Sequence, residues 1–166
     1  DGLNNQSGGL EALKSITLPD VTKIGKYALL FCVDLEEICA PNVSAIDEGA
    51  FAGCYHLRKV TLGELTDVKG DYEHGDGIFG FDSYSIKNID LSEMRKFNGR
   101  SNFANCNKME DIGKFNDEVT ELPTKSFIDC NMLKVNSLNN IIKLGDDCFK
   151  NCIELDQDIV TGVEEI

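Results

Sequence analysis

Apolar residues recur along this chain with a period of 22 to 24 residues, and the cysteines mark that period. Cys32 and Cys54 lie 22 residues apart, Cys106 and Cys130 lie 24 apart, and Cys130 and Cys152 lie 22 apart. An apolar residue stands three positions before each of these cysteines: Leu29, Phe51, Phe103, Phe127 and Phe149. A leucine or methionine stands three positions after: Leu35, Leu57, Met109, Leu133 and Leu155. A fixed period of this length predicts a solenoid in which each repeat forms one turn.

The spacing inside a repeat predicts one short strand followed by a return across the core. Ile16 and Leu18 are two residues apart, so both side chains point to the same face of an extended segment. Pro19 cannot donate a ladder hydrogen bond and therefore ends the strand. We expect Gly25 to permit a tight corner, and residues 27–32 to form about one or two turns of helix.

The repeats account for the whole sequence as a single unit. They start at Leu13, Leu35, Leu57, Ile86, Met109 and Leu133, and a seventh starts at Leu155. We therefore expect one solenoid over residues 1–166 with about six repeats, of which the repeat 57–85 carries an insertion. Partial repeats at 1–12 and 155–166 indicate a fragment of a longer array, because a solenoid normally has capping repeats at its ends.

The segment Ala50-Phe51-Ala52-Gly53-Cys54 and the repeated Leu-x-x-Ile-x-Leu-Pro pattern resemble the BspA-like, or Treponema-type, leucine-rich repeats. The resemblance covers nearly the entire chain. It implies an α/β fold: a right-handed leucine-rich-repeat solenoid with a parallel concave sheet of short strands, and short helices or turns on the other side. It also implies a secreted or cell-surface protein.

Three kinds of departure from the family pattern predict where the solenoid is least regular. Asp82 stands where a cysteine belongs, and Asn136 stands at an isoleucine position. The proline is also missing from the ends of three predicted strands, after Leu62, Leu91 and Leu138.

Charge narrows the choice of partners. Against 16 Lys and Arg the chain has 29 Asp and Glu, a net charge of -13, which repels nucleic acid and anionic lipid surfaces. No run of eighteen apolar residues is present, so we expect no membrane insertion. We expect a monomer with a protein or glycan ligand on host or neighbouring cells, in an extracellular or cell-surface location.

Seven cysteines allow metal ligands, disulfides or a buried ladder of thiols. Stacked strands lie about 4.8 Å apart, which a disulfide tolerates, so distance alone does not decide. Side chains at one repeat position point in parallel, however, and cysteine packs well as a small apolar residue, which favours buried thiols. Cys148 replaces a small core residue, whereas Cys39 alternates with Ile38 and Ala40 and is the one thiol expected to face solvent.

Catalytic interpretations find little support in the sequence. Cys54 and His56 are neighbours, but Cys54 occupies a core position and His56 lies in the following turn. Glycine-rich phosphate loops are absent, and adjacent carboxylates are expected by chance among 29. We therefore predict no catalytic residues, no cofactor and no enzyme activity.

The insertion in the third repeat contains Asp71, Tyr72, Glu73, His74 and Asp76. Its oxygen ligands and glycines could hold calcium, but the order does not match an EF-hand. Because insertions in solenoids form loops that often lie on a binding side, we favour contact with a partner over a metal site.

Strand alternation predicts an exposed row on the concave face. The candidate binding residues in this row are Ser15, Thr17, Glu37, Cys39, Lys59, Thr61, Asn88, Asp90 and Asp111, and alternation extends the row to Gly113, Val135 and Ser137. The row has no aromatic residue, so it lacks the usual protein-binding anchors. The leading hypothesis is a non-catalytic, adhesin-like interaction module, and the alternative is a structural spacer region of a larger surface protein.

Overall fold

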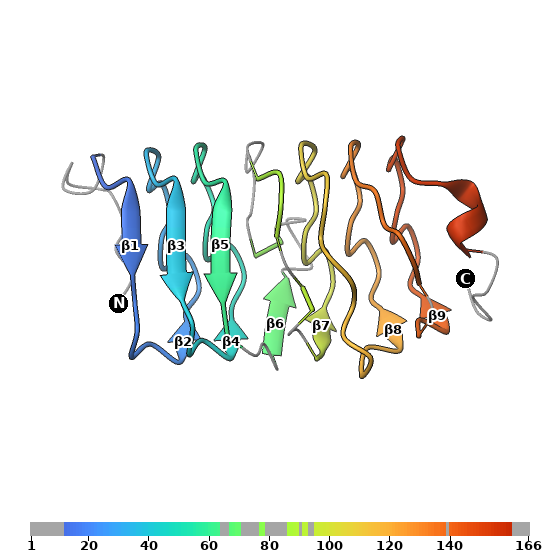
Figure 1. Ribbon diagram of the computed structural model, residues 1–166, viewed down its shortest axis with the longest axis horizontal. Coiled ribbons are helices and arrows are strands. Elements are labelled where there is room, and N and C mark those ends of the chain that lie inside the picture. The colour runs from blue at the N-terminus through green and yellow to red at the C-terminus, as the bar shows by residue number, and fades with distance from the viewer. Residues whose placement is uncertain are drawn as a thin grey trace.

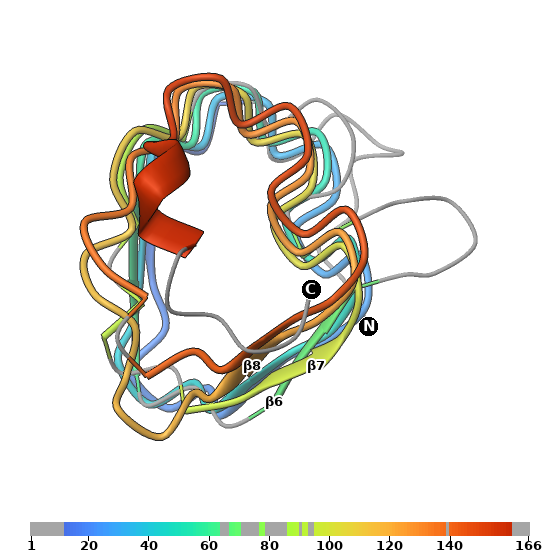
Figure 2. The ribbon, with the colours of Figure 1, turned by 90° about the vertical axis from the view of Figure 1, so that its right-hand side faces the viewer.

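The computed structural model describes residues 12–63, 67–70, 77–78, 86–89, 91–92, 95–138 and 140–160. Successive repeats form turns that stack side by side in one row, with the N-terminal repeats at one end and the C-terminal repeats at the other (Figure 1). Viewed along the row, the turns superpose into a single ring around one core (Figure 2). The solenoid predicted from the period is confirmed.

The first predicted strand of each repeat forms a parallel sheet at the N-terminal end of the row. The sheet contains β1 (Ser15–Thr17), β3 (Glu37–Ala40) and β5 (Lys59–Leu62), in the order β1-β3-β5. Ile16 pairs with Ile38, and Ile38 pairs with Val60, so equivalent repeat positions are in register. Their side chains lie on the inner face and stack along the row.

The return segment, which we expected only to cross the core, also forms strands. One sheet contains β2 (Lys23–Ile24), β4 (Ala45–Ile46), β6 (Asp67–Gly70) and β7 (Phe97–Gly99), and a separate pair contains β8 (Glu121–Leu122) and β9 (Lys143–Leu144). All pairs are parallel. Each regular turn therefore contributes to two sheets, whereas the sequence predicted one.

Residues 27–32 form consecutive turns rather than the predicted helix. Backbone N–H groups in this segment donate to the next repeat: Leu29 N to Ala50 O at 2.8 Å and Phe31 N to Ala52 O at 2.8 Å. An α-helix directs its N–H groups to its own carbonyls, so this bonding between repeats takes its place. Within the described residues the one helix is the 3-10 helix η1 (Gln157–Val160).

Left-handed backbone makes these turns possible. Tyr27 and Phe31 have φ of 54° and 56°, and Gly49 and Gly53 occupy the same two places in the next repeat. The left-handed positions recur four residues apart in the C-terminal repeats, at Ser101 and Asn105, Lys125 and Asp129, and Asp147 and Asn151. Gly25 is not among the residues with positive φ, so the corner lies two residues later than the sequence suggested.

The core consists of the repeated apolar positions. Leu35, Phe51, Leu57, Phe103 and Phe127 are fully buried. Three phenylalanines of the C-terminal repeats stack along the row: Phe103 on Phe127 with centroids 5.2 Å apart, and Phe127 on Phe149 at 5.4 Å. One continuous core runs through the described repeats and holds the turns in register.

The predicted irregularity is seen only in part: no strand forms around Asn136, whereas β5 is regular up to Leu62, and Asp82 lies outside the described residues. After β5 the first sheet is reduced, among the described residues, to one bridge between Asn88 and Asp111. In the sixth repeat Asn136 is exposed and Val135 is buried, the reverse of our expectation for Val135. With a polar residue at the isoleucine position, the valine one place earlier turns inward, and the regular strand is lost.

Candidate functional site

The candidate surface is the outward face of the first sheet. Strand register aligns its side chains in two columns, Ser15, Glu37 and Lys59 in one and Thr17, Cys39 and Thr61 in the other. Glu37 and Cys39 are half-buried and the other four are exposed. We call these six residues the strand row.

The predicted row extends only partly into the C-terminal repeats. Asn88 and Asp111 are exposed and pair through the isolated bridge. Asp111 Oδ1 accepts a hydrogen bond of 2.7 Å from Gly113 N, which folds the chain away from a strand. Asp90 lies outside the described residues, as do Asp71, Tyr72, Glu73, His74 and Asp76 of the insertion.

Charged residues flank the strand row at the position that follows the repeat leucine. Lys14 Nζ lies 3.5 Å from Glu36 Oε1, and Arg58 Nη2 lies 2.5 Å from Glu36 Oε2. Farther along, Lys87 Nζ lies 3.8 Å from Glu110 Oε1. These ion pairs join successive turns, so opposite charges offset one another beside the row.

All seven cysteines are present as thiols, as the ladder interpretation predicted. Cys54 Sγ donates to Leu29 O at 3.1 Å and Cys130 Sγ donates to Phe103 O at 3.1 Å, in each case across to the preceding described turn. Burial raises the pKa of the Cys106 and Cys148 thiols to about 12. Since the thiolate is the nucleophile, these groups are chemically inert at neutral pH.

Cys39 is not the only thiol near solvent. Cys152 is also half-buried, because it lies near the C-terminal end of the described row, and its Sγ donates to Phe127 O at 3.1 Å. Burial raises the pKa of Cys152 to about 12, so its reactivity stays low despite partial exposure. Our prediction of a single outward thiol was therefore wrong about Cys152.

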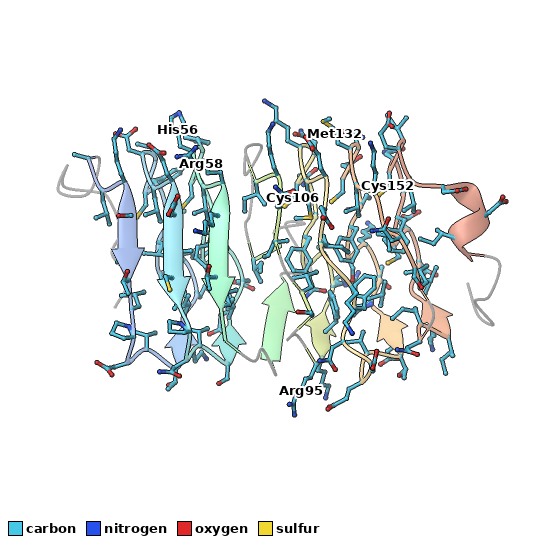
Figure 3. All side chains as sticks on the ribbon, in the orientation of Figure 1. His56, Arg58, Arg95, Cys106, Met132 and Cys152 are labelled. Carbon is cyan, nitrogen blue, oxygen red and sulfur yellow. The ribbon has the colours of Figure 1, made fainter. Side chains whose placement is uncertain are left out.

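Cys54 and His56, the nucleophile–base pair considered from the sequence, do not bond to each other. Cys54 is fully buried, and its thiol bonds to Leu29 O. His56 is exposed, and its Nδ1 lies 2.8 Å from Val33 O (labelled in Figure 3). The two side chains thus have different partners, and the arrangement provides no proton transfer between them.

Two hollows in the C-terminal repeats were not predicted from the sequence. One of about 320 Å³ is lined by Lys114, Phe115, Asp117, Ser137, Leu138, Asn140 and Ile141. The other, of about 470 Å³, is lined by Lys134, Val135, Asn136, Glu154, Asp156, Asp158 and Ile159. The sequence signal for the first was the 24-residue length of the fifth repeat, which places two additional residues between Ile112 and Val119.

The described part of the chain contains neither a candidate metal cluster nor a helix that could cross a membrane. No cluster of three or more His, Cys, Asp or Glu side chains there could hold a metal ion. Among the same residues, no helix is long and apolar enough to cross a membrane.

The chain belongs to the BspA type leucine-rich repeat family. The family model, described as a BspA type leucine rich repeat region of six copies, matches residues 8–73 and 74–156. No curated protein matches the sequence.

Three crystal structures share the fold. A leucine rich cell surface protein from Faecalibacterium prausnitzii has a TM-score of 0.68 at 19% identity, covering 87% of this chain and 38% of its own. A leucine-rich repeat protein from Bacteroides ovatus has a TM-score of 0.67 at 26% identity, covering 89% and 37%. The leucine-rich repeat protein of T. pallidum has a TM-score of 0.57 at 19% identity, covering 88% and 79%. The chain thus spans well under half the length of the first two.

Proposed function

We propose that this chain is a non-catalytic interaction module of a secreted or cell-surface protein, with the strand row as its contact surface. The supporting observation is the row itself: strand register fixes its side chains at regular intervals on a rigid, continuously packed support. Preorganisation of this kind lowers the entropic cost of binding. The ligand is a protein or glycan, and the module acts as a monomer.

The chemistry of the row favours polar recognition. It carries hydroxyls at Ser15, Thr17 and Thr61 and opposite charges at Glu37 and Lys59, which are register partners. Without aromatic or arginine anchors the row provides few hot spots, so single contacts are weak and affinity comes from many repeats acting together. The likeness to a protein described as a leucine rich cell surface protein supports the location.

A charge reversal in the row tests this proposal. The chain is immobilised and exposed to a panel of extracellular matrix proteins and glycans, first unmodified and then as Lys59→Glu. The matched control is Lys108→Glu, which makes the same charge change at an exposed residue on the turn side. We expect at least a tenfold loss of binding for Lys59→Glu and none for Lys108→Glu; equal losses, or no ligand in the panel, would overturn the proposal.

The spacer role is the second candidate, and the ion pairs between turns favour it. Lys14, Glu36 and Arg58 direct their charges at one another, which stiffens the row and leaves less charge for a ligand. In the full-length protein, scrambling the strand row distinguishes the two roles. A spacer retains its activity after scrambling and loses it when whole repeats are deleted.

A further inference from the structure

The fifth repeat carries a protruding segment that its neighbours lack. Six residues lie between Ile112 and Val119, whereas four lie between Ile38 and Val43. The amber segment extends beyond the adjoining turns at the lower edge of Figure 1 and at the lower left of Figure 2. The additional residues thus leave the ring of turns instead of compressing into it.

The hollow of about 320 Å³ lies between this segment and the sixth repeat. The protruding segment contributes Lys114, Phe115 and Asp117, and the shorter sixth repeat contributes the opposite side. Its floor is formed by the apolar side chains of Phe115, Leu138 and Ile141, each of which is less than 8% exposed. The ring of Phe115 is fixed by edge-on contacts with Phe97 and Phe127, at centroid distances of 6.0 Å.

The rim of the hollow is polar and tied together across the two repeats. Asn140 Nδ2 donates to Asp117 Oδ1 at 3.0 Å. An amide retains an acceptor oxygen and a carboxylate a second oxygen after this bond, so both keep capacity for a ligand. Lys114 adds an amino group and Ser137 a hydroxyl at the same rim.

We propose that this hollow binds one neutral hexose residue of a glycan. A pyranose ring has hydroxyls that both donate and accept hydrogen bonds, and C–H groups that pack on an apolar floor; the hollow supplies both kinds of surface. Its volume is at the small end of the range for small-molecule sites, which suits one sugar ring rather than an oligosaccharide.

Charge selects a neutral sugar over an anionic one. Lys114 and Asp117 offset each other at the rim, and the net charge of -13 repels sialylated or sulfated chains at long range. This inference rests on the proposed interaction function and names the ligand class for one part of the surface.

Saturation-transfer NMR of the whole chain with methyl glycosides of glucose, galactose, mannose and N-acetylglucosamine tests the site. We expect transfer to at least one of them, and at least a tenfold loss of affinity in Asp117→Ala and in Asn140→Ala. Lys114→Met is a third variant; because this side chain is exposed, we expect the fold to be retained and sugar binding to be weakened. Transfer to none of these glycosides overturns the proposal.

Asn42→Ala is the matched control for Asn140→Ala. Asn42 occupies the same repeat position, one residue before the returning valine or isoleucine, and its Nδ2 likewise bonds to the preceding turn, at Pro19 O, 2.6 Å away. We expect sugar binding to be unchanged in Asn42→Ala. If a sugar or another panel ligand binds the Asp117, Asn140 and Lys114 variants as it binds the unmodified chain, the hexose site is wrong while the interaction function stands.

Discussion

The two ends of the row hold their turns together by different means. In the N-terminal region, residues 12–63, β1, β3 and β5 pair along three or four residues each, and ion pairs join the turns beside them. In the C-terminal region, residues 95–160, the described first sheet is lost, while Phe103, Phe127 and Phe149 stack through successive turns. Both regions keep nearly the same period.

The difference teaches that the repeat length does not depend on one kind of bond. Stacked strands and offset aromatic rings both favour spacings near 5 Å, so either can set the distance between turns. Where Asn136 replaces an isoleucine, the strand is lost, and the core phenylalanines still hold the turns in contact. The C-terminal region is therefore irregular at its surface, and both hollows lie there.

The interiors differ as well. The residue before the core leucine or phenylalanine is Ala28 or Ala50 in the N-terminal region, but Asn102, Ser126 or Cys148 in the C-terminal region. Ser126 Oγ lies 3.3 Å from Asn102 Oδ1 and donates to Pro123 O at 2.8 Å. Polar side chains can be buried here because hydrogen bonds compensate for lost water.

Removing the central ring of the stack is expected to have the largest effect. Phe127 is fully buried and contacts Phe97, Phe103, Phe115 and Phe149. We expect Phe127→Ala to lower the free energy of unfolding by about 3–5 kcal/mol, measured by urea denaturation. Two leucine variants sharpen the comparison, since a leucine, Leu29, already occupies the repeat position of Phe51 in the N-terminal region. Phe127→Leu should cost more than Phe51→Leu, and equal costs would show that stacking does not distinguish the regions.

Glycines at one repeat position should respond differently in the two regions. A Cβ on Gly145 would lie 2.3 Å from Thr124 N, a backbone atom of the preceding turn that cannot swing aside. A Cβ on Gly25 would meet none of the described residues within 4 Å. We expect Gly145→Ala to destabilise the chain by about 1–3 kcal/mol. Gly25→Ala should be neutral or slightly stabilising in the same thermal and urea unfolding measurements, and a comparable loss there would contradict this account.

Alkaline pH should weaken the chain through its buried thiols. Burial raises the pKa of Cys106 and Cys148 to about 12, whereas an exposed thiol ionises near 8.5. The unfolded state therefore releases protons that the folded state keeps, so stability is complete below about pH 8.5 and falls as the pH rises above it. We expect a loss of about 1 kcal/mol per such thiol at pH 9.5, measured by urea unfolding with reductant.

Cys148→Ala isolates this effect and restores the residue that the N-terminal region has at Ala28 and Ala50. Between pH 7.5 and pH 9.5 this variant should lose less free energy of unfolding than the unmodified chain, by the contribution of one thiol. Any packing cost of the substitution should be the same at both pH values. If the variant loses as much stability between pH 7.5 and pH 9.5 as the unmodified chain does, Cys148 does not contribute.

The ion pairs of the N-terminal region should give the smallest effect. Glu36→Gln removes the charge that joins Lys14 and Arg58, all three being at least partly exposed. We expect a loss of less than about 1 kcal/mol, which disappears in 1 M salt. Glu110→Gln, which loses only the 3.8 Å contact with Lys87, should cost less still; a larger cost than Glu36→Gln would reverse the comparison.

Much of the fold could be predicted because the local spacing of apolar residues determines which side chains are buried. Each apolar position lies at a fixed distance along the chain from the cysteine of its repeat, and Leu35, Leu57, Met109 and Leu133 are all buried as predicted. The exposed strand row followed from alternation alone, since Ile16, Ile38 and Val60 point inward between its members. The stacking of equivalent positions likewise placed the cysteines in one buried ladder.

The sequence by itself thus determined the period, the buried positions and the solenoid. Only the tertiary structure decided the left-handed turns at Tyr27 and Phe31, the second set of strands, the inward turn of Val135 and the hollow beside Asp117. The physical reason is that these features depend on bonds and steric contacts with the adjacent turn. That turn is 22 to 24 residues away along the chain and in direct contact in space, so no local pattern specifies its surface.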